Sequence, residues 1–181
     1  MNTPLSNFEV NLNYKQVQDP AITIRLPLRG DVKTHLGLNN IPDLPIYVYV
    51  WTTTPWTLPS NLALAVNPEI NYSLVLNARD KEIVIVASNL VKTIFPELDL
   101  KKKIAEDIAA NFDVLAEVSG KQLVGLEYTQ IFSYFENERA NRAFRIYPGD
   151  FVTAEDGTGI VHCASFGEED LKLFLKYGLN I

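Results

Sequence analysis

Short apolar runs, several of them alternating with polar residues, recur along most of this 181-residue chain. Runs of this kind that are rich in β-branched and aromatic side chains, and that are separated by Gly, Pro, Asn or Asp, are typical of β-strands. Residues 72–87 and 151–164 each predict a hairpin, the second around an Asp-Gly turn. The whole pattern predicts strands over residues 21–28, 45–51, 72–76, 82–87, 112–118, 121–128, 143–147, 151–154 and 159–164.

Helical periodicity is limited to a few segments. It predicts helices over residues 89–95, 99–110 and 167–177, and Ser88 is suited to cap the first of them. The last helix begins with acidic side chains, which complement the helix dipole, and its predicted apolar face consists of Leu171, Phe174 and Leu175. Many short strands with few helices predict an α+β fold with a β-barrel-like sheet and a few peripheral helices.

The remaining segments are polar and rich in turn-forming residues. Residues 1–20 are polar and end in Asp-Pro, and we predict that they form an entry arm or linker. Residues 29–45 and 129–142 are predicted as long loops. Residues 21–181 are then one folded domain, and a chain of this length can bury a sizeable core.

Charge and composition narrow the classes of function. The net charge is −6 and the pI is about 4.9, whereas a protein that grips a nucleic-acid backbone usually carries a basic face, so any nucleic-acid contact is expected to be small and local. The single cysteine excludes an internal disulfide. No apolar run approaches membrane-spanning length and the N-terminus lacks a signal pattern, so we expect a cytoplasmic protein without membrane contact.

The most distinctive polar segment is Trp51–Asn61, with the sequence WTTTPWTLPSN. Pro55 cannot donate to a sheet ladder and disfavours helix at Thr54, so we predict that the strand ends there and that a rigid, non-helical segment leaves the sheet. Its many neutral hydrogen-bonding groups suit a neutral polar ligand, such as a ribose or an ester, better than a bare phosphate. Threonine and proline are also ordinary residues at the end of a strand.

Three groups of residues are candidates to converge on one site: the threonine-rich segment, His162 and Asp170. His162 and Cys163 are adjacent on a predicted strand, so their side chains point to opposite faces and cannot form a catalytic pair. Cys163 is therefore predicted to be a core residue. Two histidines and one cysteine give no ligand cluster, so neither a metal nor a cofactor is expected. Taken singly, each candidate also has an ordinary structural interpretation.

Taken together, the motifs point to a known family. Residues 51–61, followed by LALAVNPE at 62–69, form one signature, and DGTGIVH at 156–162 with FGEED at 166–170 forms a second. Both resemble the signatures of the editing domain of isoleucyl-tRNA synthetases, the insertion called connective peptide 1. Residues 5–20 are similar to the entry into this insertion, and the resemblance covers nearly the whole chain.

Two absences define the kind of chain that the resemblance implies. Related valyl and leucyl editing domains normally have Thr-Thr-Arg-Pro followed by an acidic residue, whereas Thr53-Thr54-Pro55-Trp56 lacks the arginine, which indicates the isoleucyl branch. The whole synthetase has a Rossmann-type core with His-Ile-Gly-His and Lys-Met-Ser-Lys-Ser motifs, and neither occurs here. The resemblance is thus to the editing insertion alone, a monomer as a fragment, whose partners are the rest of the parent chain and the aminoacylated 3′ end of the isoleucine tRNA.

The resemblance implies post-transfer editing, the hydrolysis of valine wrongly esterified to the isoleucine tRNA, with isoleucine excluded by size. A synthetic pocket rejects the smaller amino acid by only about 1–3 kcal/mol, a limit for which this enzyme family is itself the standard example. By family match, Trp56 would wall the amino-acid side chain, His162 would set the size limit and Asp170 would pair with the α-ammonium. Four residues would hold the terminal adenosine, the ester and the attacking water: Thr52, Thr53, Thr54 and Asn61.

None of these side chains is an obvious strong general base, so we expect catalysis by positioning of water and stabilisation of the oxyanion, with help from the vicinal ribose hydroxyl. One segment departs from the family pattern, because His162–Gly167 is one residue shorter than His-x-Ala-Pro-x-Phe-Gly and lacks its proline. Asp170 is assigned by its position three residues after Gly167. Three alternatives remain: editing for a related valyl- or leucyl-type synthetase, a non-catalytic module that docks the acceptor end of tRNA or a partner protein, and a free-standing structural domain, against which the polar threonine segment counts.

Overall fold

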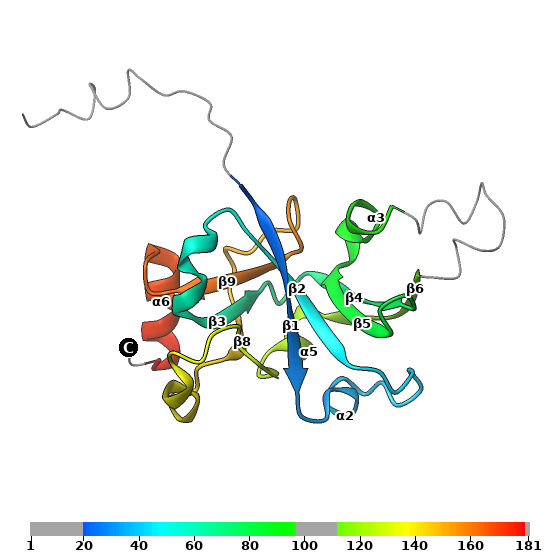
Figure 1. The fold of residues 1–181 in the computed structure, drawn as a ribbon, viewed down its shortest axis with the longest axis horizontal. Coiled ribbons are helices and arrows are strands. Elements are labelled where there is room, and N and C mark those ends of the chain that lie inside the picture. The colour runs from blue at the N-terminus through cyan, green and yellow to red at the C-terminus, as the bar shows by residue number, and fades with distance from the viewer. Residues whose placement is uncertain (1–19, 97–111, 180–181) are drawn as a thin grey trace, which may run out of the picture.

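The computed structural model describes residues 20–96 and 112–179. The nine strands in these ranges form one sheet of order β1-β7-β8-β3-β9-β2-β5-β4-β6, and a pairing between β1 and β2 closes the first six strands into a barrel (Figure 1). This closed sheet confirms the predicted α+β, barrel-like fold. The strands are β1 (Ile22–Arg29), β2 (Ile46–Thr52), β3 (Asn61–Val66), β4 (Asn71–Asn77), β5 (Glu82–Ala87), β6 (Phe112–Ser119), β7 (Glu127–Tyr128), β8 (Arg145–Pro148) and β9 (Ile160–Ala164).

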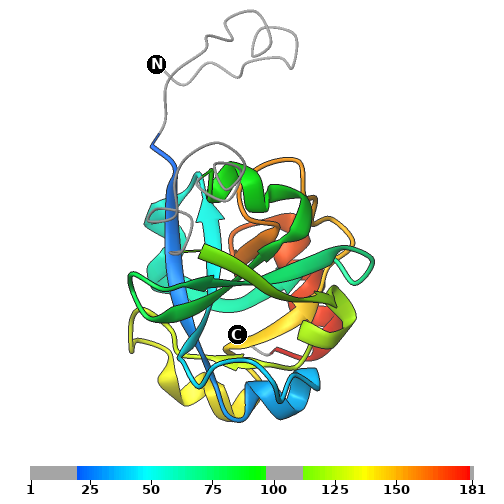
Figure 2. The ribbon, with the colours of Figure 1, turned by 90° about the vertical axis from the view of Figure 1, so that its right-hand side faces the viewer.

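Short helices connect the strands. Figure 1 shows α6 at one end of the molecule and β4, β5 and β6 at the other, and Figure 2 views the molecule from the side of these three strands. No helix in the described ranges is long and apolar enough to cross a membrane. The helices are α2 (Val32–Leu36), α3 (Val91–Ile94), α5 (Gly120–Leu123) and α6 (Glu168–Tyr177), with the 3₁₀ helices η1 (Pro55–Ser60), η2 (Ser88–Leu90) and η4 (Glu136–Asn141).

The apolar core fills the barrel and continues under α6. All residues of β3 and β5 are buried, which is why these strands have continuous apolar runs, whereas β2 alternates between buried and half-buried residues, as the sequence pattern predicts. The predicted hairpin of β4 and β5 is confirmed by its antiparallel register. A second, smaller cluster lies beneath α3 and consists of Val75, Val84, Val86, Val91, Phe95 and Phe112.

Three segments that the sequence predicts to be non-helical contain short helices. Residues 29–45 include α2, whose first turn is capped because the Asp31 side chain accepts a hydrogen bond from the backbone of Thr34 at 3.1 Å. Residues 129–142 include η4. The segment after Thr54 is the 3₁₀ helix η1, because a proline at the first helical position has a suitable φ and lacks only an N–H that would have no helical partner.

The predicted strand over residues 121–128 is wrong for most of its length. The chain first forms α5, which is initiated by a capping box in which the side chains of Ser119 and Gln122 satisfy each other's backbone N–H groups. Only β7, at the end of the segment, joins the sheet, where it pairs with β1 and β8.

The predicted hairpin over residues 151–164 is also wrong, because residues 151–154 contain no strand. β9 pairs instead with β3 and, at one position, with β2. Gly157 and Gly159 have φ values of 70° and 72° and lead the chain into β9. A Cβ on Gly159 would lie 2.4 Å from the Cβ of Ala87, so this close approach to β5 requires glycine.

The predicted helix over residues 167–177 is confirmed as α6, and Phe174 is buried as predicted, but the rest of its apolar face is different. The side chains it buries are Leu173 and Phe174, whereas Leu171 and Leu175 are 50% and 72% exposed. The predicted helix over 89–95 is present only as η2 and α3, and the hydroxyl of Ser88 does not cap it but bonds to that of Ser73 at 2.8 Å. The predicted helix over 99–110 lies outside the described residues, and so do residues 1–19 of the arm predicted over 1–20.

Candidate active site

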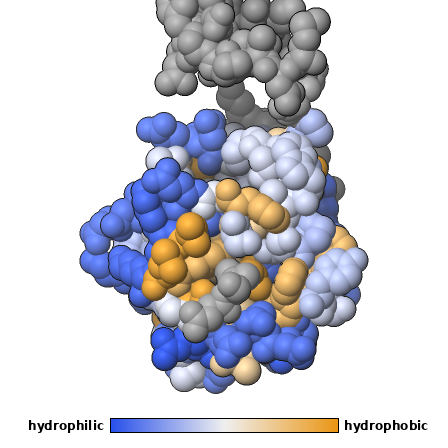
Figure 3. Space-filling view, turned by 90° about the vertical axis from the view of Figure 1, so that its left-hand side faces the viewer, coloured by the Kyte–Doolittle hydropathy of each residue, from blue (hydrophilic) through white to orange (hydrophobic). Residues whose placement is uncertain are grey.

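A cavity of about 500 Å³ lies between the end of β2, η1, β9 and the start of α6. It brings together the three groups of residues that the sequence analysis singled out. Its volume is in the range of pockets that hold small molecules. Figure 3 shows the end of the molecule that carries α6, where apolar and weakly polar surfaces meet. The lining residues are Trp51, Thr52, Thr53, Thr54, Trp56, Thr57, Val161, His162, Ala164, Phe166, Gly167 and Asp170.

A β-bulge between β3 and β9 shapes the base of this site. Along β3, Asn61 pairs with Ala164 and Ala63 pairs with Cys163, so Leu62 is an extra residue without a partner on β9. The bulge turns Asn61 to the same face of the sheet as His162, whereas a regular ladder would turn it to the face of Cys163. The Leu62 carbonyl accepts a hydrogen bond from Phe144 at 2.7 Å, so the bulged backbone is satisfied.

The threonine cluster is held by its own hydrogen bonds. Thr52 is buried, and its hydroxyl accepts a bond from the backbone N–H of Thr54 at 3.0 Å. The Thr57 hydroxyl donates to the Thr54 carbonyl at 2.7 Å. Thr53 is exposed at the mouth of the turn. The cluster therefore presents an ordered row of neutral hydroxyl groups to the cavity.

His162 is held at both ring nitrogens. Its Nε2 lies 2.7 Å from the Thr57 hydroxyl and its Nδ1 lies 3.3 Å from Nδ2 of Asn61. Because the Thr57 hydroxyl donates its proton to a carbonyl, Nε2 must carry the hydrogen in this pair, and Nδ1 is then free to accept from the Asn61 amide. Burial lowers the pKa of His162 to about 4, so the ring is neutral near pH 7.

Asn61 is buried behind the cavity and is absent from the lining formed by the described residues. Its amide nitrogen donates to the Ala63 carbonyl at 3.0 Å, and its amide oxygen accepts a bond from the Tyr128 hydroxyl at 2.6 Å. Asn61 thus contacts the cavity through His162.

Asp170 lines the cavity from the first turn of α6. Its Oδ2 accepts a hydrogen bond from the backbone N–H of Ala164 at 3.1 Å, which joins α6 to the end of β9 across the shortened segment. Burial raises the pKa of this half-buried carboxyl, while the Ala164 N–H opposes the shift. Burial and the neighbouring Asp170 also raise the pKa of Cys163, which is fully buried as the sequence predicts.

The charge of the lining limits what the cavity can hold. Among the described residues that line it, only Asp170 and His162 titrate, and no lysine or arginine is present. A neutral histidine and one carboxylate favour an ammonium group over a phosphate. No cluster of His, Cys, Asp or Glu suitable for a metal ion occurs in the described part of the chain.

The rim is aromatic, since Trp56 and Phe166 are 67% and 68% exposed beside the opening. Sequence reasoning named Trp56 but assigned no role to Thr57 or Tyr128, the two residues that complete the network around His162. Thr57 belongs to the threonine-rich signature, so its spacing was a usable signal. Tyr128 ends a predicted strand, where a tyrosine ordinarily indicates a core position.

Comparisons with known proteins identify what this fold and site resemble. No family model matches the chain. The isoleucine–tRNA ligase of Bdellovibrio bacteriovorus is 44% identical over 180 residues, and the cytoplasmic isoleucine–tRNA ligase of Saccharomyces cerevisiae is 39% identical over 180 residues. Each alignment covers 99% of this chain but 15% of the relative. The chain therefore spans a small part of the length of these relatives.

Solved structures support the fold. The structure described as GlLeuRS-CP1 has a TM-score of 0.63 and 18% identity, covering 89% of this chain and 64% of its own. The Plasmodium knowlesi (P. knowlesi) cytosolic leucyl-tRNA synthetase editing domain has a TM-score of 0.55 and 19% identity, covering 80% and 56%. The chain therefore has the fold of these class I synthetase editing domains. Its homologues over nearly the whole chain are isoleucine–tRNA ligases, which confirms the resemblance that the motifs indicate.

Proposed function

We propose that this domain hydrolyses the ester of valine mischarged to the isoleucine tRNA and spares isoleucine by size. The observation that carries the proposal is the cavity itself, in which the threonine cluster, a neutral His162 and a single carboxylate meet in a chain homologous to isoleucine–tRNA ligases. Post-transfer editing needs these elements, namely hydrogen-bonding groups for an ester, a size limit and a partner for an ammonium group.

Asp170 binds the α-ammonium of the esterified amino acid in this proposal. The carboxylate lines the cavity, and it is held there by the Ala164 N–H and by the Cys163 thiol. A half-buried carboxylate gives a charge-assisted hydrogen bond that is stronger than one between neutral groups. The same contact would orient the ester carbonyl towards the threonine cluster.

His162 and Trp56 form the walls of the space for the amino-acid side chain. His162 is held by hydrogen bonds on both ring nitrogens, so it cannot swing aside at little cost when a larger side chain enters. A site of fixed shape can reject the additional methylene of isoleucine by steric overlap, whereas a synthetic pocket cannot reject valine to the same degree.

The chemistry relies on positioned water. Both nitrogens of His162 are engaged and its ring is a weak base, so His162 does not serve as the general base. Water held by Thr52, Thr53 and Thr54 attacks the ester carbonyl, and their hydroxyl groups stabilise the oxyanion. The bond between the acyl carbon and the ribose oxygen then breaks, valine leaves, and the ribose oxygen takes the proton lost by water, with help from the vicinal ribose hydroxyl.

The partners in this proposal are the aminoacylated 3′ end of the isoleucine tRNA and the rest of a parent synthetase. The domain itself is monomeric. The Saccharomyces cerevisiae relative is named as a cytoplasmic enzyme, and we place the parent of this chain in the cytoplasm on that basis.

The test measures deacylation of the isoleucine tRNA charged either with valine or with isoleucine, at high concentrations of the domain. We expect loss of valine with isoleucine retained. Asp170→Ala should lower the rate about 10- to 100-fold, because one charge-assisted contact is worth roughly 1.5–3 kcal/mol. Glu169→Ala is the matched control, since this neighbouring carboxylate pairs with Lys172 at the surface and does not line the cavity.

Single Thr→Ala variants at positions 52, 53 and 54 test the mechanism. Each should lower the rate of hydrolysis more than the affinity, because the hydroxyl groups act on the reacting atoms. Unchanged turnover in all three would exclude the proposed role of the cluster. Binding of a non-hydrolysable valyl-adenosine analogue without any hydrolysis of valyl-tRNA would instead favour a non-catalytic acceptor-end module.

A further inference from the structure

A chain of buried hydrogen bonds leads away from the cavity to Tyr128 on β7. The Tyr128 side chain is fully buried, and its hydroxyl donates to Oδ1 of Asn61 at 2.6 Å. On its other side the Asn61 amide faces His162 and the Ala63 carbonyl. Tyr128 does not line the cavity formed by the described residues, yet only one side chain separates it from His162.

One set of hydrogen-bond directions satisfies every partner in this chain. The Tyr128 hydroxyl donates to the amide oxygen of Asn61, and the amide nitrogen faces His162. The Ala63 carbonyl favours the same amide orientation, because a flipped amide would place two oxygens against each other. Nδ1 of His162 consequently faces a donor and carries no hydrogen. The hydrogen of the neutral ring is then on Nε2.

We propose that Tyr128 is a positioning residue that, through Asn61, holds His162 as the Nε2–H tautomer in one ring orientation. Together with the Ala63 carbonyl, its hydroxyl determines which end of the Asn61 amide meets the imidazole. The tautomer in turn keeps the bond between Nε2 and Thr57, and so keeps the ring against the threonine cluster. Tyr128 would thereby fix the wall that, in the proposed function on which this inference rests, limits the size of the amino acid.

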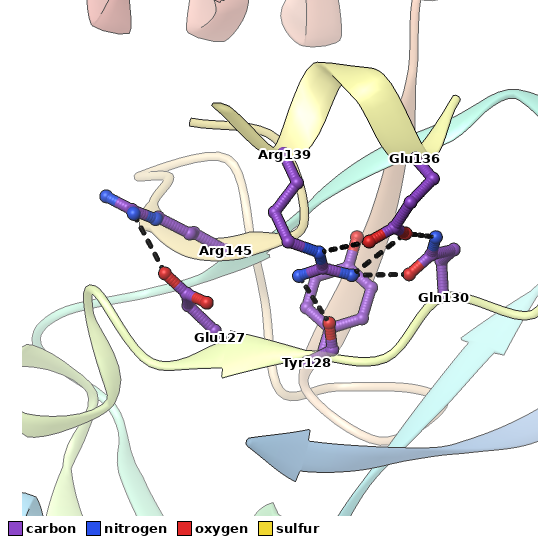
Figure 4. A network of polar contacts seen from close by, with 6 residues as sticks. All are labelled: Glu127, Tyr128, Gln130, Glu136, Arg139 and Arg145. Atoms are coloured by element: carbon purple, nitrogen blue, oxygen red, sulfur yellow. Dashed lines mark hydrogen bonds and ion pairs between the residues drawn. The ribbon is translucent and has the colours of Figure 1, made fainter. Parts of the chain in front are cut away.

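Tyr128 is itself held rigidly, as a positioning residue must be. Figure 4 shows the Arg139 guanidinium reaching from η4 to the end of β7, where it donates to the Tyr128 carbonyl at 3.2 Å and to Gln130 at 2.5 Å. Arg139 also pairs with Glu136 at 2.8 Å. The Phe144 ring packs edge-on against Tyr128 with centroids 6.1 Å apart. The backbone and ring are therefore fixed independently of the hydroxyl.

This independence makes Tyr128→Phe a clean test. The variant keeps the ring and the Phe144 contact and removes only the donor to Asn61, so the buried amide oxygen loses its partner. Only the Ala63 carbonyl then opposes a flip of the amide, so orientations that present Oδ1 to the imidazole become more populated. Those orientations accept a hydrogen from Nδ1, which stabilises both the other tautomer and the imidazolium.

The first readout does not depend on activity. In a His35→Gln background His162 is the only histidine, and its ¹⁵N chemical shifts report tautomer and protonation. We expect a single Nε2–H tautomer at pH 7, and a titration midpoint near 4, in the parent. Tyr128→Phe should give a mixture of tautomers and move the midpoint above about 5, because the flipped amide accepts from the charged ring. Asn61→Asp is the positive control, since a carboxylate oxygen favours a hydrogen on Nδ1.

Tyr72→Phe is the matched negative control, because Tyr72 is equally buried and its hydroxyl donates to the Gly159 carbonyl at 2.8 Å, away from His162. An unchanged tautomer and midpoint in Tyr128→Phe would overturn the inference whatever the activity. If hydrolysis of valyl-tRNA is present, isoleucyl-tRNA hydrolysis relative to valyl-tRNA should rise about 10-fold in Tyr128→Phe only, since a loosened wall rejects one methylene less well. Absence of hydrolysis in every variant, with the spectral change present, would overturn the proposed function and leave the positioning role of Tyr128 intact.

Discussion

At the scale of single residues, burial determines the protonation of the candidate site. His162 is neutral because an imidazolium would be poorly solvated on β9, and both of its nitrogens have neutral partners. Asp170 titrates at a higher pH than an exposed aspartate but keeps one backbone donor. The cavity is therefore lined by neutral hydrogen-bonding groups and one carboxylate, a combination that favours an aminoacyl ester over a phosphate.

The lowered pKa of His162 has a consequence for stability. Its pKa is about 4 in the folded protein and near the ordinary 6.5 in the unfolded chain, so between these values the unfolded chain binds more protons. The stability that the folded protein has with a neutral His162 is fully present above pH 6.5. This part of the free energy of unfolding is lost as the pH falls towards 4, by up to about 1.4 kcal/mol per pH unit. Between pH 7 and pH 5 this amounts to about 2 kcal/mol.

Urea denaturation of the parent and of His162→Gln at pH 7 and pH 5 measures this effect. The raised pKa of Asp170 acts in the opposite sense, since protonation of the folded state favours folding as the pH falls, and it is common to both proteins. The parent should lose about 2 kcal/mol more than His162→Gln over this interval. Equal losses would show that His162 has an ordinary pKa in the folded state.

Cys163 provides a second residue-scale prediction. Its thiol is fully buried and its pKa is raised, so the native protein should react with iodoacetamide at least about 100-fold more slowly than an exposed thiol. Cys163→Ala combined with Ser165→Cys supplies the control, because position 165 is exposed two residues along the chain. Equally fast alkylation of the two proteins would mean that β9 opens readily.

At the scale of elements, the sequence predicts those strands and helices whose local pattern agrees with their burial. β2, β4, β5 and α6 have clear periodicity and appear where it predicts them. α2 and α5 are only about one turn long, too short for a repeating apolar pattern to show, although the caps at Asp31 and Ser119 could have indicated where they begin. The closure of the barrel depends on the pairing of β1 with β2, which no local pattern encodes.

The candidate site follows the same rule. The convergence of the threonine-rich segment, His162 and Asp170 on one cavity could be predicted from motifs, because these motifs consist of particular residue types at particular spacings. The network that holds His162 could not, since the bulge at Leu62 and the approach of Tyr128 to Asn61 depend on how β3, β7 and β9 meet in space. A register shift of one residue decides which side chain faces the cavity.

The orientation of α6 gives a prediction at this scale. Leu173 is 4% exposed and Leu175 is 72% exposed, although the sequence pattern assigned Leu175 to the buried face. Leu173→Ala should lower the free energy of unfolding by about 2–4 kcal/mol, whereas Leu175→Ala should change it by less than about 0.5 kcal/mol. Guanidinium denaturation of the two variants measures the difference, and a larger loss for Leu175→Ala would mean that α6 packs by the opposite face.

At the scale of the whole molecule, charge and cavity favour contact with a small ligand group over contact with a nucleic-acid backbone. The chain has 22 acidic and 16 basic residues, and the described lining of the cavity contains no basic side chain. A domain of this charge repels an RNA backbone at long range. In the proposed function it therefore acts on the terminal nucleotide and its ester, while the parent synthetase supplies most of the affinity for tRNA.

If the domain contacts only the 3′ end of the tRNA, its activity should depend only weakly on salt concentration. Each phosphate that a protein neutralises on a single strand contributes about 0.7 to the slope of log affinity against log salt concentration. With contacts confined to the 3′ end, the KM for valyl-tRNA should follow a slope below about 2 between 50 and 200 mM KCl, and a valyl-adenosine ester should show almost none. Salt also screens the repulsion between the acidic surface and tRNA, so a slope of zero or of reversed sign for valyl-tRNA agrees with the proposal as well.

The contradicting result is a slope of about 5 or more for valyl-tRNA, with none for the small ester. Such a slope would require an extended basic surface on this domain, and its contacts would then not be confined to the acceptor end.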